Sequence, residues 1–189
     1  MRLRSKTSPE WLETVLGDFD RFLVDHALCE RKASALAMSL VAHYPDKKDL
    51  VSAMIDLAIE ELDHFKQVFA LIVERDLFLG ADEKDDYVNR LRRFIRKSSD
   101  EYFLDRLLIA SIIECRGTER FQLVAQGLSD PRLKEFYMEF WRAEARHAGL
   151  FLRFAKKYFP ADVVEERYDY LLDQEAVIVE SLPLRAAVH

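Results

Sequence analysis

The sequence predicts an all-α protein built around four long helices. Helix-ending signals divide the chain, whereas no Asn-Gly or Asp-Gly hairpin and no sustained period-two alternation is present. Four segments instead carry apolar residues at steps of three and four, which keeps one helical face toward a core. The chain has 189 residues, of which 50% are hydrophobic and 33% charged. This composition predicts a single folded domain, residues 1–189.

The first elements are read from their end signals. Ser8 followed by Pro9 indicates a helix start, and the short helix that it opens ends near Gly17. Two long helices are expected next, at about Asp18–Tyr44 and Lys48–Leu79, with a proline or glycine after each. These two helices are joined by a short turn, so they predict a helical hairpin.

The second half repeats this arrangement after a long crossover. The crossover contains an additional helix, expected at about Asp82–Lys97. The third long helix ends near Gly127, and Asp130-Pro131 begins the fourth, which stops at Pro160. A last helix is expected at about Asp162–Glu180, before an exposed C-terminal tail. The fold expected from these elements is a four-helix bundle with short N-terminal and C-terminal helices.

Composition excludes several function classes. Lys and Arg number 28 against 34 Asp and Glu, a net charge of −6, which does not indicate a nucleic-acid binder. Two cysteines, Cys29 and Cys115, are too few for a disulfide framework and indicate a reducing compartment. No apolar run is long enough for a membrane span, and no apolar segment follows the basic N-terminus. A soluble, cytoplasmic protein without a membrane partner is expected.

Each long helix carries a glutamate in the middle of its apolar stripe. These residues are Glu30, Glu61, Glu114 and Glu144. A carboxylate buried without a partner costs several kcal/mol or shifts its pKa and becomes neutral. Four of them on four apolar faces indicate shared cations, although buried ion pairs are an alternative.

Two of these glutamates belong to Glu-x-x-His motifs, completed by His64 and His147. Positions i and i+3 share a helical face, so the carboxylate and the imidazole can bind one metal ion. Each motif follows the glutamate of the preceding helix by about 30 residues. One glutamate from each of two helices and Glu-x-x-His from the other two is the di-iron or di-manganese carboxylate pattern. This predicts a dinuclear site for iron or manganese, whose ligands are Glu30, Glu61, His64, Glu114, Glu144 and His147.

The roles of two residues near the expected ligands stay open at this point. Glu60 competes with Glu61 as a ligand, but its helical face includes Asp56, Asp63 and Gln67 and is therefore expected to face solvent. His26 lies one turn before Glu30 and is either a partner of that ligand or an ordinary core histidine.

The segments around the expected ligands resemble the bacterial tRNA hydroxylases of the MiaE family. The resemblance is carried by Phe22–Ser34, Glu60–Phe65, Glu114–Phe121 and Glu144–His147. It implies a ferritin-like fold and a non-haem di-iron centre with these six residues as ligands. It also implies O2-dependent hydroxylation of the isopentenyl group of 2-methylthio-N6-isopentenyladenosine in tRNA, next to the anticodon.

Several consequences follow for cofactors and partners. O2 is the co-substrate, and an external reductase supplies electrons because the chain has no Gly-rich nucleotide-binding loop. Quinone-type hydroxylases, peroxide scavengers and iron-handling proteins share the ligand chemistry and are the alternative functions. A monomer or small oligomer is expected, since storage shells are large.

A tRNA substrate requires a local basic surface. The best candidate residues are Arg90, Arg92, Arg93, Arg96 and Lys97. Acids open the same predicted helix, so these bases could merely complement the helix dipole. Two divalent cations would bring the net charge from −6 to −2, so the acidic composition does not exclude tRNA.

Overall fold

The structure, a computed structural model, describes residues 3–189 and contains seven helices and no strand in that range. The chain divides into two compact units. Unit 1 holds the chain up to Leu16, then Lys84–Arg185 and His189, and unit 2 holds Gly17–Glu83 and Ala186–Val188. Within residues 3–189 no helix is both long and apolar enough to cross a membrane. The all-α prediction is confirmed.

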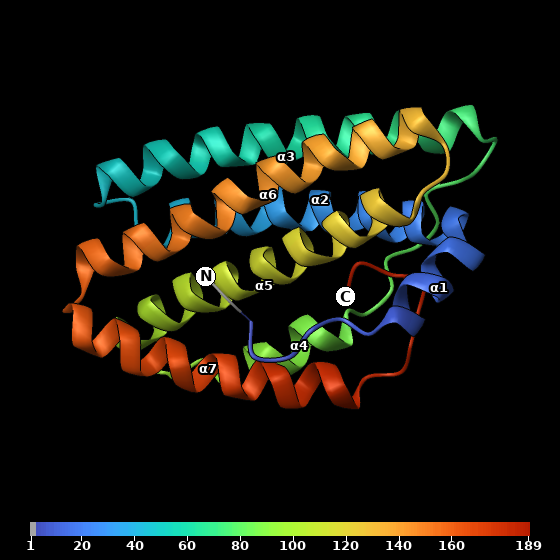
Figure 1. Cartoon of the computed structure of the whole chain (residues 1–189). Helices are drawn as coiled ribbons and strands as arrows, with labels where there is room; N and C mark the ends of the chain where they lie inside the picture. The colour runs from blue at the N-terminus through green and yellow to red at the C-terminus, as the bar shows by residue number, and fades with distance from the viewer. Residues whose placement is uncertain (1–2) are drawn as a thin grey trace. The chain divides into compact units, whose positions relative to one another are not determined.

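Unit 2 is an antiparallel pair of long helices, α2 (Phe19–His43) and α3 (Lys48–Glu74) (Figure 1). Asp18 caps α2 by accepting a hydrogen bond from the backbone N–H of Arg21. The two helices are fastened midway, where the Ser34 hydroxyl donates to the Ala58 carbonyl at 2.9 Å. The core of the pair is the predicted apolar stripe.

Helix α3 ends five residues earlier than predicted, at Glu74 rather than Leu79. The Leu77 N–H donates to the Ile72 carbonyl and the Asp76 N–H to the Val73 carbonyl, which is the Schellman arrangement. Asp76 occupies the position that usually holds glycine, with φ +55°. The prediction relied on Gly80 as the end signal, and an aspartate in the left-handed conformation ended the helix first.

The long pair of unit 1 is α5 (Ser99–Gly127) and α6 (Pro131–Tyr158), which also run antiparallel. Asp130 caps α6, and the Ser111 hydroxyl donates to the Ala148 carbonyl at 2.9 Å. Two further helices of the unit are α1 (Pro9–Gly17) and α7 (Ala161–Ser181), close to their predicted bounds. A Cβ on Gly127 would lie 3.0 Å from Leu12, so the glycine allows α1 to pack closely on the end of α5.

The crossover helix α4 (Asp86–Arg92) is shorter than the predicted Asp82–Lys97. Asp85 starts it by accepting from the Val88 N–H at 2.9 Å. Beyond its end, the Arg96 N–H donates to Asp105 instead of to a helical carbonyl. A capping aspartate and a long-range carboxylate therefore set the bounds, and the run of basic residues does not continue the helix.

A buried charged network holds α4, α5 and α7 together in unit 1. Arg116 and Glu175 are both fully buried, with Nε and Oε1 2.8 Å apart. The Tyr87 hydroxyl donates to the same Glu175 oxygen at 3.0 Å. Burial, followed by the charge of Glu175, raises the pKa of Tyr87 well above its usual range. Burial and the adjacent Arg116 lower the pKa of Arg120 to about 10.

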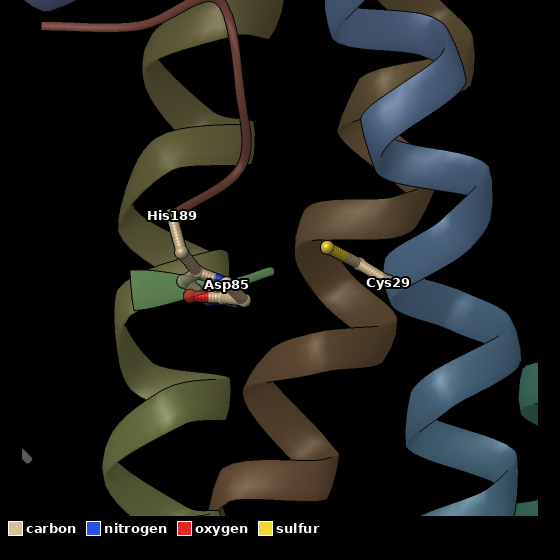
Figure 2. Close-up of side chains that lie close together, drawn as sticks. All are labelled: Cys29, Asp85 and His189. Carbon is tan, nitrogen blue, oxygen red and sulfur yellow. The ribbon is translucent and has the colours of Figure 1, made fainter. Parts of the chain in front are cut away.

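The C-terminal tail was expected to be exposed, and this expectation is wrong. Ala186, Ala187 and Val188 are buried, and the Val188 N–H donates to Asp25 of α2 at 2.6 Å. In unit 1, the His189 ring stacks on Tyr87 with centroids 5.0 Å apart. Its Nδ1 lies 3.3 Å from a carboxylate oxygen of Asp85, and Figure 2 shows these two side chains next to each other. Small apolar side chains at the tail gave no sequence signal for this docking.

Candidate metal centre

The ligand cluster of unit 2 consists of Glu30 on α2 and the Glu61/His64 motif on α3. Each of the three offers a ligand atom within 4.8 Å of the others. His64 Nδ1 lies 3.3 Å from Glu61 Oε2 and 3.5 Å from Glu30 Oε2. All three side chains are buried, with Glu61 1% exposed. The antiparallel pairing of α2 and α3 thus brings together residues far apart in the sequence.

His26 belongs beside this cluster, which decides the question that the sequence left open. Its side chain is fully buried on α2, and Nε2 lies 2.8 Å from Glu30 Oε1. A polar neighbour of this kind orients a ligating carboxylate. His26 is therefore a direct neighbour of Glu30, placed where it would orient this carboxylate toward a bound metal ion.

The ligand cluster of unit 1 has the same composition. Glu114 on α5 and the Glu144/His147 motif on α6 offer ligand atoms within 4.8 Å of one another. His147 Nδ1 lies 3.2 Å from Glu144 Oε2, and all three residues are buried. The two helical pairs therefore present equivalent sets of two carboxylates and one imidazole.

The donor set of each cluster fits a divalent metal ion. Two carboxylates and one imidazole stay negative as a set even when the imidazole is protonated, and a buried negative set is costly. A divalent cation supplies the missing charge, and hard carboxylate oxygens with imidazole nitrogen suit iron or manganese. Glu60, the competing candidate, is half-buried, whereas Glu61 lies on the buried face of α3.

The five basic residues predicted to contact tRNA occupy α4 and the link to α5. Arg92, Arg93 and Lys97 are exposed, and Arg90 is partly buried. Arg96 differs from them, because its guanidinium binds Asp105 through two nitrogens at 2.9 Å and also Glu101. Arg96 therefore anchors the link between α4 and α5.

A second basic surface lies on α6, and its arginines were not among the residues predicted to contact tRNA. It consists of the exposed residues Arg142, Arg146, Arg153 and Lys157. Their steps of four, seven and four place them on one helical face. The signal was present in the sequence, but the bases are dispersed among apolar and ligand positions and form no charge run.

Unit 1 contains a cavity of about 310 Å³, and some of its lining residues directly follow predicted ligands in the sequence. Its lining includes Cys115, Ala145 and Ala148, which follow Glu114, Glu144 and His147 directly. Thr118, also in the lining, donates its hydroxyl to the Glu114 carbonyl at 2.7 Å. Burial raises the pKa of the Cys115 thiol.

Known proteins similar to this chain agree on one family. The whole chain, residues 1–189, matches the family described as tRNA-(MS[2]IO[6]A)-hydroxylase (MiaE). A relative from Pseudomonas putida, tRNA 2-(methylsulfanyl)-N(6)-isopentenyladenosine(37) hydroxylase, is 37% identical over 80% of this chain and 74% of its own length. A protein of the same name from Salmonella typhimurium is 30% identical over 72% of this chain and half of its own length.

A solved structure shows the same fold. It is Protein 43 with aldehyde deformylating oxygenase activity from Synechococcus, with a TM-score of 0.94 and 36% identity over 98% of this chain and 93% of that one. The predicted ferritin-like fold is confirmed by this likeness. Since the family match runs from the first residue to the last, this chain belongs to the MiaE family of tRNA hydroxylases.

Proposed function

We propose that the chain is an O2-dependent di-iron monooxygenase that hydroxylates the isopentenyl group of 2-methylthio-N6-isopentenyladenosine in tRNA. The observation that carries this proposal is the pair of equivalent buried clusters, each with two glutamates and one histidine. The family match and the names of both relatives support the substrate. The compartment is the cytoplasm, where tRNA is modified.

The six predicted ligands would hold two iron ions, with Glu30, Glu61 and His64 on one hairpin and Glu114, Glu144 and His147 on the other. When bound, two iron ions supply two-electron reduction of O2, with electrons from an external reductase. The chain itself holds the ligands in position and keeps bulk water away from the metal site. Glu61 and Glu144 are fixed on buried helical faces, His26 orients Glu30, and the apolar neighbours of the clusters exclude bulk water.

The tRNA is held through phosphate contacts on unit 1. Arg90, Arg92, Arg93 and Lys97 offer one basic surface. The α6 surface, Arg142, Arg146, Arg153 and Lys157, offers another on the helix that carries Glu144 and His147. Arg96 supports the first surface indirectly, because its guanidinium binds Asp105. Contacts of this kind position the nucleic acid without reading its sequence.

Nucleoside analysis of tRNA tests the substrate. The purified protein, loaded anaerobically with Fe(II) and supplied with a chemical reductant and O2, is incubated with tRNA that carries the prenylated nucleoside. The expected product gains one oxygen atom by mass spectrometry, and 18O2 labels it. If the protein is folded and fully loaded with iron and the prenylated nucleoside gains no oxygen, the proposed substrate is wrong.

Aldehyde deformylation is a second candidate function. The Synechococcus structure favours it, because that protein is 36% identical to this chain and the Pseudomonas putida relative is 37% identical. Assaying the same loaded protein with an aldehyde and a reductant separates the two activities. Release of the shortened hydrocarbon without oxidation of tRNA would favour the second function over the first.

A further inference from the structure

An apolar stripe runs along the outer face of α3, opposite to the face that carries Glu61 and His64. Its five apolar members are 40% to 62% exposed, and an exposed lysine completes the spacing. The stripe consists of Ile55, Ile59, Leu62, Lys66, Phe69 and Val73. We call these six residues the α3 stripe.

The spacing of the α3 stripe is that of a helix that packs against another helix. Its members follow one another at steps of four, three, four, three and four, the a and d positions of a heptad repeat. From Ile55 to Val73 the stripe is about 27 Å long at 1.5 Å per residue. Isolated exposed apolar residues are normal, but a continuous row of this length indicates an interaction surface.

We propose that the α3 stripe is a homodimer interface in which α3 packs antiparallel against α3 of a second copy. The pattern is self-complementary about the level of residue 64. Ile55 then faces Val73 of the other copy, Ile59 faces Phe69, and Leu62 faces the aliphatic stem of Lys66. A two-fold axis repeats each of these contacts, as an isologous interface requires.

The charged residues near the centre of the α3 stripe favour the antiparallel direction and a second copy of the chain as the partner. In a parallel pair, Lys66 would lie against its own equivalent, and the two ammonium groups would repel each other. In the antiparallel pair, Lys66 lies beside Asp63 of the other copy, one residue from its Leu62 contact. Asp63 is exposed on the flank of the stripe, where Gln67 donates to it at 2.7 Å. The centre of the interface thus contains two opposite-charge pairs, which a second copy supplies without any other partner.

The dimer is expected to be weak, because one helix pair buries less than the ~800 Å² per partner of a standard interface. Its mass is measured by sedimentation equilibrium of the metal-loaded full chain, at protein concentrations from about 1 to about 200 µM. The average mass should rise from 22.2 kDa toward twice that value. A single 22.2 kDa species over the whole range would overturn the proposal.

Matched substitutions locate the interface. Ile59→Glu should raise the dimer dissociation constant at least about 30-fold. Val177→Glu, on α7 and equally exposed at 61% against 62%, should leave it unchanged. Both variants should keep the circular dichroism of the parent chain, since neither side chain lies in the core. Equal effects of the two substitutions would contradict an interface on α3.

Charge exchange tests the antiparallel direction. Lys66→Glu alone and Asp63→Lys alone should each weaken the dimer about tenfold, and the double variant should recover it. A double variant weaker than either single one would exclude the antiparallel pairing. If the parent chain stays monomeric while Ile59→Glu slows electron delivery from its reductase, the stripe belongs to a different protein and the homodimer is wrong.

Discussion

The chemistry of this protein depends on which face of a helix a single glutamate occupies. Glu60 and Glu61 are adjacent and identical in type, but only Glu61 lies on the buried face with His64 one turn away. A step of one residue rotates a side chain by about 100° around the helix. The same chemical group is therefore a candidate ligand at one position and lies off the buried face at the next.

Glu114→Ala should abolish hydroxylation and leave the helix content unchanged. The substitution removes one of two carboxylates from the unit 1 cluster and little packing, because Glu114 is 8% exposed at the edge of the core. Iron content and nucleoside analysis measure the loss. Glu60→Ala is the matched control and should retain activity. Full activity of the Glu114→Ala variant would exclude this residue as a ligand.

His26→Phe should weaken metal binding by about 10–100-fold, the effect expected from losing a group that orients a ligand. Competition with a chelator measures the affinity without requiring turnover. His26→Gln keeps a polar group next to Glu30 and should recover part of the affinity. His43→Gln, at the exposed end of α2, serves as the control and should bind metal like the parent chain.

At the residue scale, the sequence was enough to identify candidate metal ligands. It was not enough to identify the side chains that contact them. The burial of all six candidate ligands could be predicted because charged residues on a regular apolar stripe are conspicuous. His26 could not be assigned, since a histidine on the same stripe is equally at home in a core. Only the 2.8 Å contact with Glu30 distinguishes the two roles.

Helix ends were predicted well where typical capping residues mark them, and less well where such residues are absent. Ser8-Pro9, Asp18 and Asp130-Pro131 mark true helix starts. The end of α3 was missed because Asp76 takes the left-handed conformation that glycine usually provides. The extent of α4 was missed because Asp105, a residue outside the helix, binds the Arg96 backbone. Contacts of this kind are long-range and leave no local pattern.

Asp76→Gly should stabilise the chain by about 1 kcal/mol, because glycine adopts a positive φ without the steric cost of a Cβ. The same substitution inside the helix, Asp56→Gly, should destabilise the chain by about 0.3 kcal/mol, because aspartate is already a poor helix former. Urea unfolding of both variants measures the difference. Opposite signs are the expected result, and destabilisation by both would exclude a strained end of α3.

At the scale of the whole molecule, an acidic protein has to bind an acidic polymer. The net charge of −6 is an average, and unit 1 carries two dispersed basic surfaces on α4 and α6. Association with tRNA depends on such local surfaces and on salt rather than on net charge. Composition alone therefore underestimates the capacity of the chain to bind RNA.

Replacing Arg142 and Arg146 with Gln should weaken tRNA binding and reduce the slope of log affinity against log salt by about two. The matched pair Arg92→Gln with Arg93→Gln tests the other surface, and Lys48→Gln on α3 is the control. Fluorescence anisotropy at several salt concentrations provides the slopes. Slopes that stay equal in all variants would exclude phosphate contacts at both surfaces.

The division of the six predicted ligands between two helical hairpins also has a consequence for how the protein acquires its metal. Glu30, Glu61 and His64 lie on the α2–α3 hairpin, and Glu114, Glu144 and His147 lie on the α5–α6 hairpin. Loading can therefore proceed in two steps through a half-filled form. Limiting Mn(II) should produce the paramagnetic signal of isolated ions, and excess Mn(II) should replace it with that of coupled ions. Supply of the second ion, after both hairpins have folded, would then complete the metal centre.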